Sequence, residues 1–88
     1  MYDIEVRERL DRAFKKLGKK DARQMEAIAK KVEEIADDPH AYKPLRFPLA
    51  GLRRVHIGSY VLLFSVDEAR KTIILKDYEH HDRVYRTR

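Results

Sequence analysis

The 88-residue sequence contains no cysteine and no asparagine, and its one glutamine is Gln24. A chain without cysteine has no disulfide, no thiolate nucleophile and no cysteine-based zinc site, and it suits a reducing compartment. Charged residues make up 40% of the sequence, and abundant charge with few thermolabile amides is typical of hyperthermophile proteins. We therefore expect a cytoplasmic protein from a thermophilic source.

Long apolar runs are also missing. No stretch approaches the roughly 18 residues of a membrane span, and no signal-peptide pattern is visible. P-loop, GxGxxG, GxSxG and HExxH motifs are absent too, so nucleotide-dependent and hydrolase functions have no motif support. The length suits a single domain over residues 1–88, and we expect no membrane partner.

Acidic residues are absent from one long stretch. Residues 39–66 contain no Asp or Glu, and the chain has a formal charge of +5. The basic side chains of this stretch are Lys43, Arg46, Arg53 and Arg54, with His40 and His56 beside them. A basic zone on a small domain favours a polyanionic partner, nucleic acid before membrane. The alternative is an evenly solvated surface.

Residues 52–66 predict a β-hairpin, because Gly58-Ser59 suits a two-residue type II′ turn between strands rich in β-formers. This turn sets the register, with Ile57 opposite Tyr60 and His56 opposite Val61. Side chains alternate across a strand. One face therefore forms a core of Val55, Ile57, Tyr60, Leu62, Phe64 and Val66. The other, which we expect to stay open, carries Arg54, His56, Val61, Leu63 and Ser65.

Two amphipathic helices precede the hairpin. The spacing of Leu10, Ala13, Phe14 and Leu17 predicts a helix over residues 7–17, which Gly18 would end as a C′ residue. Asp21 is a suitable N-cap for a second helix, with Gln24 in the capping-box position. The second apolar stripe runs to Ala36, and residues 37–39 close it. A short link at residues 18–20 predicts an antiparallel helical hairpin.

The remaining segments complete an α+β fold of two layers. Residues 2–6 alternate apolar and acidic side chains and predict a strand with one buried face; residues 72–76 predict another strand. Residues 60–66 are almost wholly apolar, which favours a central strand. The order is β-α-α-β-β-β, with a three-stranded antiparallel meander at the end and both helices on one sheet face. The proline-marked loop 37–51 is of a length that is often functional.

The C-terminal tail carries two adjacent histidines, His80 and His81. A histidine titrates near neutrality and suits proton transfer. On a regular strand or helix adjacent histidines point apart, and His40 and His56 are the remaining candidate imidazole ligands, so we expect no metal site. A polar tail without a function is the alternative. The aromatic residues outside the helices could stack on unpaired bases: Tyr42, Phe47, Tyr78 and Tyr85. We expect Tyr78 at a core edge and Tyr85 to be functional.

Taken together, these segments resemble the RelE/ParE superfamily of toxins from toxin–antitoxin modules, over essentially the whole chain. The most specific parts are the hairpin pattern Arg54-x-His56-x-Gly58-x-Tyr60 and the tail Val84-Tyr85-Arg86. In this superfamily RelE-like members cleave messenger RNA in the ribosomal A site, ParE-like members inhibit DNA gyrase, and a cognate antitoxin silences both. The resemblance implies an antitoxin that lays an amphipathic helix or strand on the domain and covers or displaces the tail.

The resemblance also suggests roles for individual residues. Arg54 and His56 stand where RelE-like toxins carry two basic residues, and Tyr85 matches the tail tyrosine of the family. His81 falls close to the position at which many members have a catalytic arginine or histidine. Val61 departs from the pattern, since active RelE-like nucleases usually have arginine there, and this removes a cation from the centre of the expected site.

The sequence therefore predicts a RelE-branch toxin that is a metal-independent endoribonuclease acting on mRNA on the ribosome, without a cofactor. We expect Arg54 and Arg53 to stabilise the phosphate and His81 or His56 to transfer protons. Tyr85 would orient the substrate or stack on it. Backbone contacts to RNA fall to Lys43, Arg46, Arg83 and Arg86. The alternatives are a ParE-like gyrase inhibitor, a degenerate member that only binds its antitoxin, and a general RNA-binding module.

Overall fold

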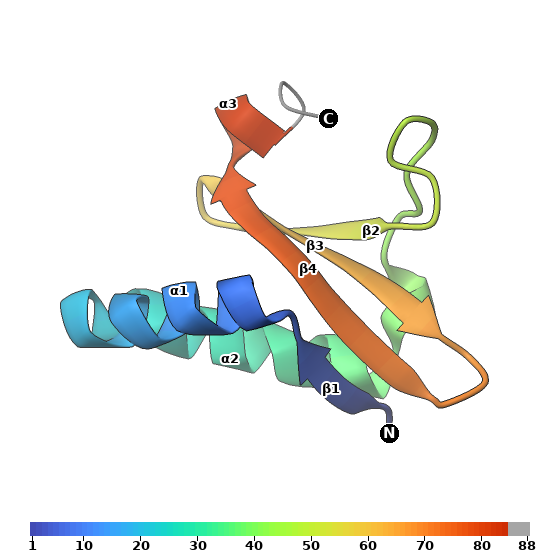
Figure 1. Cartoon of the computed structure of the whole chain (residues 1–88), viewed down its shortest axis with the longest axis horizontal. Coiled ribbons are helices and arrows are strands. Elements are labelled where there is room, and N and C mark those ends of the chain that lie inside the picture. Colours follow the sequence, from blue (N-terminus) through green and yellow to red (C-terminus); the bar gives the residue numbers. More distant parts are fainter. Residues whose placement is uncertain (85–88) are drawn as a thin grey trace.

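The computed structural model describes residues 1–84, and its elements follow the predicted β-α-α-β-β-β order. They are β1 (Asp3–Val6), α1 (Glu8–Lys20), α2 (Ala22–Asp37), the 3₁₀ turn η1 (Pro39–Ala41), β2 (Arg53–Ile57), β3 (Tyr60–Asp67), β4 (Thr72–His80) and α3 (His81–Val84). The antiparallel helices α1 and α2 cover one side of the sheet, and α3 and the loop before β2 stand on the other side (Figure 1). The predicted α+β two-layer fold is confirmed. In the described part of the chain no helix is long and apolar enough to cross a membrane.

The four strands form one sheet in the order β1-β4-β3-β2. The hairpin register is the predicted one, with Ile57 opposite Tyr60 and Arg54 opposite Leu63. Gly58 has φ +61°, as the first central residue of a II′ turn requires. The N-terminal strand β1 lies parallel to β4 at the sheet edge. Its predicted buried face is only partly realised, because an edge strand has one neighbour and Ile4 stays 37% exposed.

Strand β3 is buried on both faces. Leu62 and Phe64 join the main core with β2, β4 and the two helices. Val61 and Leu63 form a second, smaller core with Val84 of α3, and both are fully buried. The prediction of an open second face is therefore wrong, because α3 and the loop 42–52 cover its centre. Partly buried Leu45 and Leu52 supply the loop side of this cover.

The loop 42–52 is held by a backbone hydrogen bond, in which Leu45 N–H donates to the Leu52 carbonyl at 2.9 Å. Two local expectations need correction. Tyr60 is expected in the core but is 39% exposed, with its ring stacked on Tyr78 at 4.9 Å. Strand β4 extends to His80 rather than ending at position 76.

Gly18 does not end the first helix, which continues to Lys20. Asp21 N–H donates to the Leu17 carbonyl at 2.7 Å and closes α1, while the Asp21 carboxylate accepts from Gln24 N–H at 3.1 Å and caps α2. One residue thus serves both helices, and no left-handed glycine is needed. The Gln24 side chain does not complete a capping box, because its amide donates to the Tyr78 hydroxyl.

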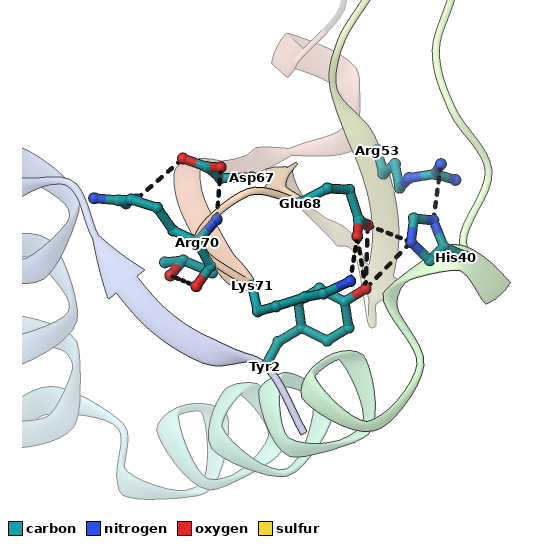
Figure 2. A network of polar contacts seen from close by, with 8 residues as sticks. Tyr2, His40, Arg53, Asp67, Glu68, Arg70 and Lys71 are labelled. Atoms are coloured by element: carbon teal, nitrogen blue, oxygen red, sulfur yellow. Dashed lines mark hydrogen bonds and ion pairs between the residues drawn. The ribbon is translucent and has the colours of Figure 1, made fainter.

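A polar network ties the N-terminus to the far end of the sheet (Figure 2). The Glu68 carboxylate, in the turn between β3 and β4, accepts hydrogen bonds from Tyr2 at 3.1 Å and Lys71 at 2.9 Å. His40 of η1 contacts the same carboxylate through Nε2. The Lys71 ammonium, with smaller contributions from His40 and Tyr2, lowers the pKa of Glu68 to about 2. The network therefore favours the ionised carboxylate in the folded state.

We expect Gly18→Ala to raise the free energy of unfolding by about 0.5–1 kcal/mol, since glycine inside a helix costs backbone entropy. An added Cβ would meet Met25 Cγ at 3.7 Å, an ordinary contact. Gly58→Ala is the control: no atom lies within 4 Å of its Cβ, yet positive φ should lower stability by about 1–2 kcal/mol. Urea denaturation measures both, and a destabilised Gly18→Ala variant would contradict the continuous helix.

We expect Glu68→Gln to lower the free energy of unfolding at neutral pH and to make it less dependent on pH. The pKa of Glu68 is depressed in the folded state from 4.5 to about 2. The ionised group therefore stabilises the fold above pH 4.5, and this contribution is lost as the pH falls toward 2. Urea denaturation from pH 7 to pH 2 should show the wild type and the variant converging. Glu33→Gln, an exposed carboxylate of α2, is the control, and a gap between wild type and Glu68→Gln that is constant with pH would refute the assignment.

Candidate functional site

Three of the predicted basic residues meet around one hollow beside the hairpin. Lys43, Arg46 and Arg54 line a depression of about 450 Å³ together with Pro44 and Leu45. The loop reaches this position because Arg54 N–H donates to the Lys43 carbonyl at 3.4 Å and Pro44 bridges Arg53. Guanidinium and ammonium groups around a concave surface are suited to phosphate oxygens. The basic loop and β2 thus form one cationic surface.

His56 extends this surface along the same strand face. Arg54 and His56 are two residues apart on β2, so their side chains point to the same face of the sheet, and the His56 ring is exposed. Opposite His56 is Val61, which is fully buried beneath Val84. The expected neighbour of His56 on an open face is therefore an apolar anchor for α3. Lys43, Arg46 and Arg54 line the hollow on the side of Leu45, which itself packs against this anchor.

Helix α3 presents His81 at the other end of the hairpin. Its backbone N–H donates to the Ser59 carbonyl at 2.9 Å, and its ring Nδ1 lies 3.0 Å from the same oxygen. This geometry assigns the hydrogen to Nδ1 and leaves Nε2 to exchange a proton. Nε2 lies 3.1 Å from Asp82 Oδ1. His81 is thus held by the turn that also fixes the hairpin register.

The two adjacent histidines do not point apart. The strand ends at His80 and the helix begins at His81, so the two rings lie with centroids 4.6 Å apart. The two histidines do not share one regular element, so the expectation that their rings point apart is wrong. Arg83 is exposed beside them. Tyr85 and Arg86, the predicted stacking and RNA-binding residues of the tail, lie outside the described residues.

Arg53 lies apart from Arg54, because neighbouring strand residues point to opposite faces. Its guanidinium donates to the Tyr42 carbonyl at 2.7 Å and approaches His40 Nδ1 at 3.4 Å (Figure 2). An arginine donor at Nδ1 leaves the His40 hydrogen on Nε2, where it reaches Glu68. Arg53 thus orients the loop that carries Lys43 and joins the network around Glu68.

Sequence reasoning missed two carboxylates near the site. Glu79 pairs with Val61, and Asp77 pairs with Leu63, so both carboxylates share the sheet face of His56 and Arg54. An irregularity in the pairing at Leu63/Phe64 switches the sheet faces to which the following side chains of β4 point. The face that Asp77 and Glu79 occupy can be known only once this irregularity is seen. Phe47, which the sequence already offered as a stacking residue, follows Arg46 in the basic loop and is 89% exposed.

Two of the other candidate aromatic residues, Tyr42 and Tyr78, pack against the core. Tyr78 packs edge-on against Phe14 at 5.7 Å, which confirms its place at the core edge. Burial raises the pKa of the Tyr78 phenol, and Gln24 donates to its oxygen. Tyr42 contacts Phe64 edge-on at 5.9 Å. Phe47 is therefore the aromatic ring of the described loop that is available for stacking.

The comparisons with known proteins agree over nearly the full chain. The family model described as the ParE toxin of the type II toxin–antitoxin system parDE matches residues 4–85. A Methanocaldococcus jannaschii protein, named RelE4 and provisionally described as a toxin, is 51% identical over 98% of this chain and 93% of its own length. A Methanosarcina mazei protein is 46% identical over 97% of this chain and 100% of its own length.

Solved structures show the same fold. The RelBE2 toxin–antitoxin complex from Mycobacterium tuberculosis superposes with a TM-score of 0.77 and 26% identity, over 90% of this chain and 96% of that chain. The isolated RelE toxin of E. coli gives a TM-score of 0.73 and 20% identity, over 91% and 84% of the two chains. Together with the family match, these likenesses establish that the chain belongs to the RelE/ParE superfamily and is a toxin of a type II toxin–antitoxin system.

Proposed function

We propose that this toxin is a metal-independent endoribonuclease that cleaves messenger RNA in the ribosomal A site. One observation carries the proposal: Lys43, Arg46 and Arg54 surround one hollow on the side of the sheet that also presents His56. RNA is a polyanion, and this surface lies within a stretch of 28 residues, 39–66, that contains no carboxylate. The relative named RelE4 supports the same branch.

The chemistry requires three functions. The ribose 2′-oxygen attacks the adjacent phosphorus, the bond to the 5′-oxygen breaks, and the proton released by the 2′-hydroxyl is balanced by one given to that 5′-oxygen. Arg54 stabilises the charge on the non-bridging oxygens. His56 and His81 transfer protons, and Glu79 is a further base candidate on the same face. Tyr85 retains its predicted role in stacking on the substrate.

The loop 42–52 holds the RNA strand around the site. Lys43 and Arg46 contact phosphates, and exposed Phe47 stacks on a base, an interaction that tolerates any sequence. Arg53 acts by orienting this loop through its bond to the Tyr42 carbonyl. Arg83 and Arg86 add backbone contacts from the tail.

A second function is favoured by one specific observation. Val61 is fully buried under Val84, so an apolar contact stands where RelE-like nucleases carry a cation. The alternative is a toxin that binds DNA gyrase and does not cleave RNA, or a member that binds only its antitoxin. A general RNA-binding module, with salt-sensitive binding and no cleavage, is the third candidate.

Antitoxin binding has a candidate surface on the helix side of the molecule. Related toxins have been solved as complexes with antitoxins. In this chain, an apolar groove of about 320 Å³ lies between α1 and the start of β3. Its apolar lining is Leu10, Ala13, Phe14, Leu17, Tyr60 and Tyr78. An amphipathic helix of the antitoxin fits such a groove.

We expect Arg54→Ala to reduce A-site cleavage by about 10²–10³-fold, as loss of one charge-stabilising donor does, and His81→Ala to reduce it by about 10²–10⁴-fold. Primer extension on mRNA bound to translating ribosomes measures the rates. Arg12→Ala is the control, because Arg12 is exposed on α1 and pairs with Glu8. Unchanged rates in both site variants would reject the assignment. Supercoiling inhibition without cleavage by the wild type would favour the gyrase function.

We expect Ala13→Arg to break antitoxin binding without changing cleavage, because a cation in the apolar groove must lose hydration when the partner docks. The measurement is co-purification with the antitoxin, which we expect to be a short acidic protein encoded by a neighbouring reading frame. Ala29→Arg, at an exposed alanine of α2 that does not line the groove, is the matched control. Equal co-purification of both variants would place the antitoxin elsewhere.

A further inference from the structure

We propose that His80, His81 and Asp82 form a binding site for a divalent transition-metal ion of the zinc class. Within the described part of the chain this is the one group of three His, Asp or Glu side chains placed to hold an ion. One ligand atom from each residue lies within 4.8 Å of the other two. The site exists because the chain changes from strand to helix between the two histidines.

Tetrahedral coordination requires rotation of the three side chains, because the two histidines face different oxygens of Asp82 and the ligand atoms lie within 4.8 Å of one another. Zinc bonds of about 2.0–2.2 Å place neighbouring ligand atoms roughly 3.3–3.5 Å apart. His81 Nε2 lies 3.1 Å from Asp82 Oδ1, and His80 Nδ1 lies 3.6 Å from Asp82 Oδ2. His80 gives up the hydrogen bond that its Nδ1 accepts from Asp82 N–H at 3.2 Å, and water can replace that acceptor because Asp82 is exposed.

An outer hydrogen bond already prepares one ligand. His81 Nδ1 lies 3.0 Å from the Ser59 carbonyl oxygen. A backbone carbonyl at one ring nitrogen of a histidine is the usual partner in metal sites, because it fixes the tautomer that presents the other nitrogen to the ion. Here that nitrogen is Nε2, which faces the Asp82 carboxylate. The Ser59 carbonyl belongs to the hairpin turn, so the ligand is held by the rigid sheet.

The donor set selects the class of ion. Two imidazoles and one carboxylate suit zinc and its neighbours, whereas magnesium and calcium prefer oxygen ligands. Three protein ligands leave one position for water. An open hollow of about 470 Å³, lined in part by His80, Asp82 and Glu79, gives the ion access. Arg83 also lines this hollow, and the two carboxylates offset its charge.

The consequence for activity rests on the proposed function. An ion on His81 Nε2 occupies the nitrogen to which we assign proton transfer, so zinc inhibits cleavage and does not support it. The toxin would then be active when metal-free and silenced reversibly by zinc.

The test is calorimetric titration of zinc chloride into the full chain. We expect one ion per chain, and a loss of affinity of at least about tenfold in His80→Ala, His81→Ala and Asp82→Asn, since even loss of an outer partner costs that much. The control is His56→Ala, which removes an exposed imidazole outside the group and should bind zinc as the wild type does. Thermal unfolding without metal shows that the variants fold, and zinc should raise the melting temperature of the wild type and of His56→Ala by more than that of the three ligand variants.

Wild-type affinity in both His81→Ala and Asp82→Asn would overturn the site, and so would one ion per two chains. This readout does not depend on RNA, so a chain that never cleaves RNA disproves the proposed function and leaves the metal site to be decided by calorimetry. If the chain cleaves RNA, primer extension with one equivalent of zinc should show slower cleavage by the wild type, and unchanged cleavage would disprove the inhibition alone.

Discussion

The structure depends on the burial of one strand from both sides. Four consecutive residues of β3, from Val61 to Phe64, have no exposed surface. Complete burial of an aliphatic or aromatic side chain is worth roughly 1.5–3 kcal/mol, so this strand stabilises two separate layers. Leu62 and Phe64 hold the helical pair, and Val61 and Leu63 hold α3 and the loop 42–52.

The second of these layers positions the candidate site. His81 comes from α3, and Lys43 and Arg46 come from the loop, more than thirty residues away in the sequence. None of these segments has a core of its own. Val84 anchors the helix and Leu45 and Leu52 anchor the loop, all against Val61 and Leu63. Two buried aliphatic residues therefore set the places of the charged groups around them.

Local patterns account for what the sequence could predict. The Gly58-Ser59 turn defined the hairpin register, and that register alone placed Arg54 and His56 on one face. Features that depend on distant contacts could not be read. Gly18 is typical of a helix C-terminus, but the helix continues past it. Asp21 ends the first helix through its backbone N–H and caps the second through its carboxylate. The irregularity opposite Leu63 arises because β4 has one extra residue, Lys76, and no local sequence pattern at Lys76 predicts it.

Val61 shows how an apolar residue can be both a departure from a catalytic pattern and a structural requirement. With Val84 packed above it, an arginine at position 61 would bring a charge into a fully buried position, where its loss of hydration costs several kcal/mol. The chain instead keeps α3 fixed by apolar contact and carries its cations around the rim, at Lys43, Arg46 and Arg54. Under the proposed function, a substrate phosphate would therefore be held from the side of the loop, and proton transfer would come from His56 on the strand and His81 on the helix.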